Sequence, residues 1–475
     1  MKALFSTLFS TTPAEKVRRL TCWRQLCSSY LPVFQEGSIW RYNRRPGPED
    51  PEQGWKLHVS ATVLNAHRVL ERIAPLLVER GVQFKAPASL GELKRLNSGL
   101  HYSYTQIGKV ITVYPGSDEE AAVIAREIHE LTRHMMAPSV PFDLRYKAGS
   151  NVYYRYGAFR SLEMDLPGGG ARVSAVKDPR GNLVPDLYGA ENAKPLWAEN
   201  PFPTRRARAT KDNPLKTTFR VFRALSQRGK GGVYQAVDLS TSPPRLCLVK
   251  EGRKAGELGW DRRDGRWRVK YEEHVLANLR EGGVDVPEVY SSFELAGNYY
   301  IVTEFVDGEC LQSILMKKKR RLSLARALNY GIQLSWLIAQ IHTTGWIWRD
   351  CKPTNLILTE SGKLRSVDFE GACPIDQPDA LPWMSPAFTP PAGRGGSRGR
   401  SAVYDDLFAL GTVIYLLLTG RMPEVCPPPQ RIRKLRCNTP AVVCKLVSEL
   451  LDPDARHLPD AREVADQLTT ALGAP

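Results

Sequence analysis

The most informative stretch of this sequence is Trp348–Asn355, WRDCKPTN, which is followed by Val367–Phe369, VDF. The first stretch carries an acid, Asp350, and an amide, Asn355, and the second carries another acid, Asp368. Phosphoryl transfer needs such a set, because an acid must orient the attacking hydroxyl and oxygen ligands must hold Mg²⁺ near the phosphates. We therefore expect Asp350 to orient or deprotonate a substrate hydroxyl, and Asn355 and Asp368 to bind Mg²⁺.

These stretches resemble the H-R-D-x-K-x-x-N and D-F-G motifs of the eukaryotic-type protein-kinase family. The resemblance implies a two-lobed fold that binds ATP, or another NTP, together with Mg²⁺. It makes Lys352 a further catalytic residue. It also implies that Lys250, in LCLVK, contacts the phosphates, with Glu272 or else Glu273 as its partner on a helix. Asp406, in DDLFALG, matches the aspartate that braces the catalytic loop.

The sequence departs from that family's pattern in its glycine-rich loop and around the catalytic motifs. The loop reads SQRGKGGVY, so Gly231 matches the third glycine of the family's motif. We expect Gly229 and Gly232 to supply the remaining flexibility and backbone N–H groups that bind phosphates. Trp348 replaces the His of the motif, and Glu370 stands where Gly is usual. Because the metal and phosphate ligands are retained, we expect an active kinase.

A second pattern lies in the N-terminal part, where WKLHVSAT alternates like a strand with one polar face. Lys56 and His58 share that face, with their Cβ atoms roughly 6.5–7 Å apart. A base and an acid are thus placed on one side of a substrate. A lysine can remove an α-proton if nearby cations lower its pKa, and expulsion of phosphate needs an acid and cations. The candidate cations are Lys85, Lys109, Arg145 and Arg155.

Three stretches, GWKLHVSAT, GKVITVYP and PFDLRYKAGSNVYYRYGAF, resemble the phosphothreonine-lyase-like domain of lanthionine synthetases. The resemblance implies that Lys56 is the base and His58 the acid. It implies that Lys85, Lys109 and Arg155 hold the phosphate. Tyr156 would stabilise the enolate or position the backbone.

Length and composition agree with a protein of several folded parts. A chain of 475 residues exceeds one ordinary core. We divide it into a lyase-like domain (1–165), a Pro/Gly-rich linker or arm (166–216) and a kinase-like domain (217–475), of α+β class in both domains. No run approaches the roughly 18 apolar residues of a membrane span, so we expect no membrane association. Nine cysteines without C-x-x-C pairs favour a reducing, cytoplasmic location.

A kinase joined to a phosphate-eliminating lyase resembles class III and class IV lanthionine synthetases. The resemblance implies phosphorylation of Ser or Thr in a ribosomal precursor peptide, then β-elimination to dehydroalanine or dehydrobutyrine. A leader segment of the peptide would be held meanwhile, and the net charge of +16 suits an acidic partner. Nucleic acid is not favoured, because the aromatic and basic interleaving of a single-strand binder is missing. A homo-oligomer is compatible with the sequence.

The third domain of those enzymes, a cyclase, has no counterpart in the sequence pattern. The dense cysteines, Cys426, Cys437 and Cys444, fall within the kinase-like domain, so we expect no zinc. Ring closure would then be absent, spontaneous, or the work of a separate cyclase. Two other functions stay open. One is a regulatory Ser/Thr kinase whose N-terminal domain binds phosphosites, and the other is a pseudokinase scaffold that binds a leader peptide.

Overall fold

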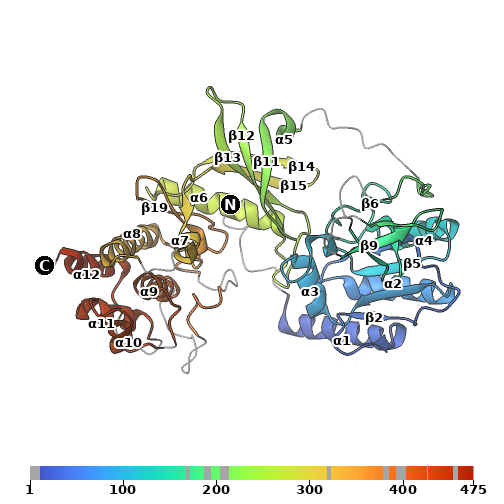
Figure 1. Cartoon of the computed structure of the whole chain (residues 1–475), viewed down its shortest axis with the longest axis horizontal. Helices are drawn as coiled ribbons and strands as arrows, with labels where there is room; N and C mark the ends of the chain where they lie inside the picture. Colours follow the sequence, from blue (N-terminus) through green and yellow to red (C-terminus); the bar gives the residue numbers. More distant parts are fainter. Residues whose placement is uncertain are drawn as a thin grey trace.

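The computed structural model describes residues 11–166, 172–186, 194–203, 213–317, 322–377, 385–391, 403–424, 426–452 and 458–473. Two bodies lie side by side, one built from the first part of the chain and one from the second (Figure 1). Each contains both helices and sheet, which confirms the α+β class. Among the described residues, no helix combines the length and the apolar composition that crossing a bilayer would require.

The N-terminal body is a seven-stranded sheet with the order β1-β2-β4-β5-β3-β7-β6, and every neighbouring pair in it is antiparallel. Its strands are β1 (Val33–Phe34), β2 (Trp40–Tyr42), β3 (Gln53–Val59), β4 (Gln83–Pro87), β5 (Ile111–Tyr114), β6 (Leu144–Arg145) and β7 (Val152–Ala158). Its helices are α1 (Pro13–Tyr30), α2 (Ala66–Glu79), α3 (Leu90–Ser98), the 3-10 turn η3 (Tyr104–Gln106) and α4 (Asp118–Thr132).

The alternation of polar and apolar residues along β3 determines which face of this sheet packs against the hydrophobic core. Leu57 and Val59 are fully buried and join one cluster with apolar residues of α2 and α4. Successive residues of a strand point to opposite faces, so Lys56 and His58 project from the other side. The polar face expected from the sequence is therefore the face of the sheet turned away from this core.

A small three-stranded sheet follows, with the order β10-β9-β8. It comprises β8 (Glu163–Asp165), β9 (Arg172–Lys177) and β10 (Leu183–Pro185), and we call it the arm. Gln53 fixes the arm to β3, because its amide donates to the Lys177 carbonyl (2.8 Å) and accepts from the Lys177 N–H (2.6 Å). Part of the expected linker, 166–216, thus forms strands packed on the N-terminal body, while much of the rest lies outside the described residues.

The second body has two lobes. Its first lobe is a five-stranded sheet with the order β11-β12-β13-β15-β14, and helix α6 packs against β13 and β15. These elements are β11 (Phe219–Gln227), β12 (Gly231–Asp238), β13 (Arg245–Gly252), α6 (Gly265–Glu281), β14 (Val289–Leu295) and β15 (Asn298–Glu304), preceded by α5 (Pro214–Thr217).

The second lobe is mainly helical, and its buried residues form one large cluster centred on α8 and α9. Its helices are α7 (Leu311–Lys317), α8 (Leu324–Thr343), α9 (Tyr404–Thr419), α10 (Pro429–Leu435), α11 (Ala441–Leu450) and α12 (Ala461–Gly473). Between them run β16 (Glu309–Cys310), β17 (Trp346–Ile347), the turn η4 (Pro353–Asn355), β18 (Leu356–Leu358), β19 (Leu364–Ser366) and β20 (Cys373–Pro374).

The two bodies touch where α1 and α3 face the first lobe (Figure 1). The Gly229 N–H, at the tip between β11 and β12, donates to the Ser98 carbonyl at the end of α3 (2.9 Å). The Arg262 guanidinium pairs with Glu15 of α1 at 3.3 Å. The glycine-rich loop of one body is therefore hydrogen-bonded to the backbone of the other.

Candidate active sites

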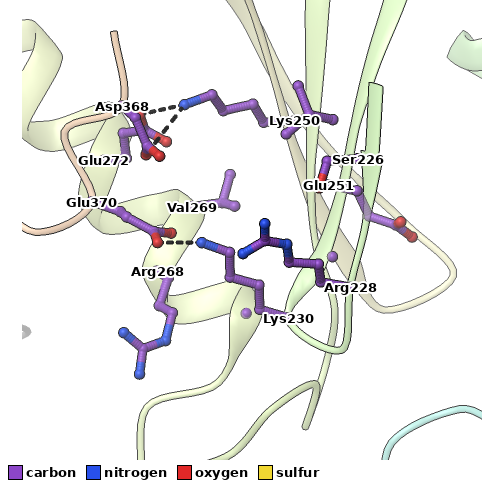
Figure 2. A pocket seen from close by; sticks show the side chains of 14 residues that line it. Ser226, Arg228, Lys230, Lys250, Glu251, Arg268, Val269, Glu272, Asp368 and Glu370 are labelled. Carbon is purple, nitrogen blue, oxygen red and sulfur yellow. Dashed lines mark hydrogen bonds and ion pairs between the residues drawn. The ribbon is translucent and has the colours of Figure 1, made fainter. Parts of the chain in front are cut away.

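Lys250 lines a pocket together with residues of β11, β12 and α6 and with Asp368, and its amine points toward Glu272 and Asp368 (Figure 2). Its amine is 2.5 Å from Glu272 of α6 and 3.8 Å from Asp368. Burial alone would lower the pKa of Lys250, but Glu272 and Asp368 hold it above its usual value. Glu272 also accepts the Phe369 N–H at 3.0 Å. The amine is therefore a permanent cation, and its partner is Glu272, the first of the two glutamates considered.

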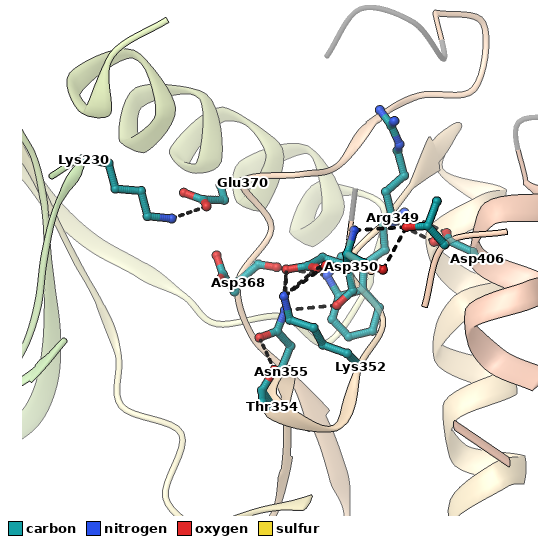
Figure 3. A network of polar contacts seen from close by, with 12 residues as sticks. Lys230, Arg349, Asp350, Lys352, Thr354, Asn355, Asp368, Glu370 and Asp406 are labelled. Carbon is teal, nitrogen blue, oxygen red and sulfur yellow. Dashed lines mark hydrogen bonds and ion pairs between the residues drawn. The ribbon is translucent and has the colours of Figure 1, made fainter. Parts of the chain in front are cut away.

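Asp350 is 1% exposed and holds three donors around one carboxylate (Figure 3). Lys352 donates to its two oxygens at 2.7 and 2.9 Å, and the Asn355 amide nitrogen donates at 2.7 Å. The third donor is the hydroxyl of Ser385, which our sequence reasoning missed. A hydroxyl already lies against Asp350, in the place that the attacking hydroxyl of a substrate would need.

Asp368 and Asn355 are suitable ligands for a hard cation. Burial would raise the pKa of Asp368, but Lys250, Lys230 and Lys352 lower it, so the carboxylate stays ionised. Asn355 directs its nitrogen to Asp350, which turns its amide oxygen away from that carboxylate. Mg²⁺ prefers carboxylate and amide oxygens, so the residues present fit the expected metal.

Asp406 of α9 braces the loop that carries Asp350. It accepts the backbone N–H groups of Trp348 (2.7 Å) and Arg349 (2.6 Å). Arg349 has a φ of 63°, a left-handed conformation that costs a non-glycine residue energy. The Trp348 ring stacks on Phe369 and its Nε1 donates to the Asp368 carbonyl at 3.0 Å. The tryptophan that replaces the motif's histidine therefore ties the two catalytic segments together.

The glycine-rich loop differs in part from our expectation. Gly231 and Gly232 line the pocket together with Lys250. Gly229 does not line it, because its N–H is committed to Ser98. Lys230, which is not among the residues expected from the sequence, points into the pocket and pairs with Glu370 (Figure 2). Glu370, which stands where the kinase motif usually has glycine, is thus the counter-ion of Lys230 in the glycine-rich loop.

In the N-terminal body, the pairing of the strands brings the polar side chains together on one face of the sheet. Lys85 pairs with Thr112, Thr112 pairs with His58, and Lys56 pairs with Arg155. Paired residues project to the same side of a sheet, so β4, β5, β3 and β7 present these side chains together. We call Lys56, His58, Lys85, Lys109 and Arg155 the cation face; Lys109 lies just before β5.

The burial and the crowding of cations on this face lower the pKa of its lysines. Protein atoms replace water around the Lys56 amine, and Arg155 repels its charge, so its pKa falls to about 7 although Asp186 opposes the change. The pKa of Lys85 falls to about 8, because of desolvation and then Lys109. Near neutral pH, both amines therefore hold a neutral fraction that can take up a proton.

His58 is held by a carboxylate that our sequence reasoning missed. Its Nδ1 is 2.5 Å from Asp143, and Lys109 pairs with the other oxygen of Asp143 at 3.0 Å. Burial lowers the pKa of His58 to about 4, although Asp143 opposes this. Burial would raise the pKa of Asp143, but His58 and Lys109 lower it to about 2. Because Asp143 takes Nδ1, the other nitrogen, Nε2, is left for a substrate.

The remaining candidates divide between the cation face and its surroundings. Arg155 lies on the face, is 2% exposed, and pairs with Asp186, which directly follows β10. Arg145 lies on the edge strand β6 opposite Tyr153, which pairs with His58, so it projects to the side of the cation face, and its Nε donates to the Tyr153 hydroxyl at 2.7 Å. Tyr156 projects to the opposite face, against Trp55 (ring centroids 5.6 Å apart). This position does not suit the expected role of Tyr156 at the enolate, because neighbours along β7 alternate between faces, whereas its role in positioning the backbone stays a prediction.

Comparison with known proteins finds two families in succession. The family described as "RamC, N-terminal domain" matches residues 33–214, and "Protein kinase domain" matches residues 222–469. "Probable SapB synthase" of Streptomyces coelicolor is 30% identical over 399 residues, covering 81% of this chain and 42% of that protein. "Serine/threonine-protein kinase F" of Synechocystis is 28% identical over 217 residues, covering 42% of this chain and 43% of that kinase. The chain thus spans less than half the length of each of these relatives.

Proposed function

Because this chain belongs to the lanthionine synthetase-like proteins, which join a RamC N-terminal domain to a protein kinase domain, we propose that it dehydrates Ser and Thr in a precursor peptide. The proposal has two steps, phosphorylation in the kinase domain and β-elimination on the cation face. The observation that carries it is the joint presence of the Lys250–Glu272 pocket and the Lys56–His58 face on one chain.

In the first step, ATP with Mg²⁺ supplies the phosphoryl group, and Asn355 and Asp368 would hold the metal. Asp350 accepts the hydrogen of the peptide hydroxyl and orients its oxygen toward the γ-phosphorus. The new O–P bond forms as the bond to the departing ADP breaks. Lys250 and the partly exposed Lys230 place positive charge beside the phosphates. Lys352 stabilises the charge that Asp350 and the reacting oxygen share.

In the second step, Lys56 removes the α-proton of the phosphorylated residue. The electron pair forms the Cα=Cβ double bond, the Cβ–O bond breaks, and phosphate leaves. His58, held by Asp143, gives the departing oxygen its proton. The negative charge of the incoming phosphate raises the pKa of His58 and so charges it with that proton. Lys85, Lys109 and Arg155 bind the phosphate oxygens.

Lys85 is a second candidate for the base, since its pKa also falls, to about 8. Its amine lies over the Trp40 ring, 4.4 Å from the centroid, and so keeps a partner when protonated. Variants separate the two lysines. If Lys56 is the base, Lys56→Ala stops exchange of the α-hydrogen in deuterated water, whereas Lys85→Ala slows turnover mainly through weaker phosphate binding.

The proposed partner is a ribosomal precursor peptide with a leader segment, which fits the excess of positive charge. A separate cyclase or another tailoring enzyme would then act on the dehydrated product.

The direct test of the lyase step uses a peptide that already carries phosphoserine or phosphothreonine, without nucleotide. We expect release of inorganic phosphate and formation of the dehydro residue, and we expect both to vanish in His58→Ala. Tight binding of the phosphopeptide without release of phosphate would favour a regulatory kinase with a phosphosite-binding domain. Peptide binding without phosphorylation or elimination would favour the pseudokinase scaffold.

A further inference from the structure

Asp186 brings a negative charge to the cation face from outside the main sheet. Its carboxylate pairs with Arg155, and the side chain is 9% exposed. The same carboxylate is close enough to raise the pKa of both Lys56 and Lys109. The Asp186 carboxylate therefore interacts electrostatically with three of the five residues of the cation face, which are Lys56, Lys109 and Arg155. The proposed function requires phosphate to bind at the same place.

The other carboxylate of this site, Asp143, has a different position. It is fixed between His58 and Lys109, at 2.5 and 3.0 Å, and its side chain is fully buried. Removing it would leave His58 without its orienting partner. Asp186 instead contacts Arg155, which lies opposite Lys56 in the register of β3 and β7, whereas Tyr153 lies opposite His58. Of the two carboxylates, Asp186 is therefore the one that can leave without disturbing the acid.

Asp186 also sits on an element outside the seven-stranded sheet. It belongs to the end of the arm, where its N–H donates to the Ser174 carbonyl of β9 (2.7 Å). The arm is joined to β3 through Gln53, near the start of that strand and away from His58. The seven-stranded sheet keeps all its pairings if Asp186 moves away. The carboxylate can thus exchange while the cation face stays assembled.

We propose that Asp186 occupies the position that substrate phosphate takes on the cation face, and that the phosphate of a phosphorylated peptide displaces it. This inference rests on the proposed function for the nature of the substrate. A phosphate dianion gains more than a carboxylate monoanion from the same cations, since the attraction scales with charge. An unphosphorylated Ser or Thr brings no charge and leaves Asp186 paired with Arg155. After elimination, the return of Asp186 competes with inorganic phosphate and promotes its release.

The test measures binding of inorganic phosphate to the full chain by calorimetry, without nucleotide or peptide. We expect Asp186→Asn to bind phosphate about tenfold more tightly, equivalent to about 1.4 kcal/mol, because the competing charge is removed. Asp165→Asn is the matched control, since it removes one charge from the same arm at a side chain that is 81% exposed. We expect its phosphate affinity to equal that of the wild type.

Further variants keep the inference falsifiable. Asp186→Ser removes the charge with a smaller side chain and should give the same gain if Asp186→Asn fails to fold. Adding Arg155→Gln to Asp186→Asn should abolish the gain. Unchanged or weaker phosphate binding in folded Asp186→Asn and Asp186→Ser would overturn the inference and make Asp186 a residue that only positions Arg155.

Binding and turnover separate this inference from the proposed function. If the wild type fails to eliminate phosphate from a phosphopeptide but Asp186→Asn binds phosphate more tightly, the proposed function fails and the exchange of anions stands. If the wild type eliminates phosphate and folded Asp186→Asn shows no gain, only the inference fails. If both the proposed function and the inference hold, inorganic phosphate should inhibit elimination by Asp186→Asn at lower concentrations than those that inhibit the wild type.

Discussion

At the scale of single residues, this chain obtains its chemistry by changing the surroundings of ordinary side chains. Lys56 becomes a candidate base because desolvation and then the charge of Arg155 lower its pKa to about 7. Lys250 becomes a permanent cation because Glu272 and Asp368 act in the opposite direction. The main charged neighbour of Lys56 is a cation, whereas those of Lys250 are anions. This difference suits Lys56 to the proposed proton transfer and Lys250 to the proposed binding of phosphate.

The pKa of Lys56 gives a first prediction. Titration of ¹³C-labelled lysine by NMR, with Lys56→Arg to identify the signal, should give a midpoint near pH 7. Asp186 raises this pKa, so Asp186→Asn should move the midpoint to lower pH, and loss of the Arg155 charge should move it to higher pH. A midpoint near the usual value of about 10.4 for lysine would contradict the account.

The contact between Asp143 and His58 gives a second prediction. Asp143→Asn should lower the rate of elimination by about 100-fold, since general acid catalysis contributes roughly 10²–10⁴ and His58 loses its anionic partner. Phosphorylation of the peptide should continue, so phosphopeptide should accumulate and be visible by mass spectrometry. Asp178→Asn, in the exposed turn of the arm, is the control. Normal elimination by Asp143→Asn would remove Asp143 from the site.

At the scale of elements, the parts that lie close together in the sequence could be predicted, and contacts between distant parts could not. Alternation in WKLHVSAT predicted the polar face of β3. Nothing local in the sequence marks Asp186 or Ser385 as partners of Arg155 and Asp350, because folding brings these pairs together. The enolate role expected for Tyr156 conflicts with a local signal, since Tyr156 directly follows Arg155 and so projects to the other face of the sheet.

The loop that carries Asp350 gives a prediction for one element. Asp406→Asn should weaken the two backbone hydrogen bonds that hold the left-handed Arg349 in place. We expect peptide phosphorylation to fall by about 100-fold, because misplaced reacting groups lose the benefit of orientation. Elimination from a prephosphorylated peptide should be unaffected, which is the internal control. Equal loss of both activities would indicate general unfolding, and full kinase activity would exclude the bracing role.

At the scale of the whole molecule, the junction between the domains involves the glycine-rich loop, whose neighbouring residues Lys230 and Gly231 line the pocket. The Gly229 N–H donates to Ser98, and Asn97 beside it donates to the Ala61 carbonyl (3.0 Å) and accepts the Gly108 N–H (3.0 Å). Ala61 lies just beyond β3, and Gly108 precedes Lys109 of the cation face. A short path of hydrogen bonds therefore joins the glycine-rich loop to the strands that carry the cation face.

Gly229 is the residue at which this junction can be tested. A Cβ atom there would lie 1.7 Å from the Asn97 carbonyl oxygen, a distance at which the backbone must move. We expect Gly229→Ala to raise the KM for ATP by several-fold, because the loop is pushed away from its support. Gly473→Ala, where the added Cβ meets nothing within 4 Å, is the control. An unchanged KM for ATP would mean that the contact does not hold the loop.

The most direct test of the central claim is the intact mass of a Ser- and Thr-containing precursor peptide after incubation with this protein, ATP and Mg²⁺. The account predicts a loss of the mass of one water per modified site, with a phosphorylated intermediate that accumulates in His58→Ala. A stable gain of phosphate, with no later loss of water in the wild-type reaction, would contradict the two-step dehydration.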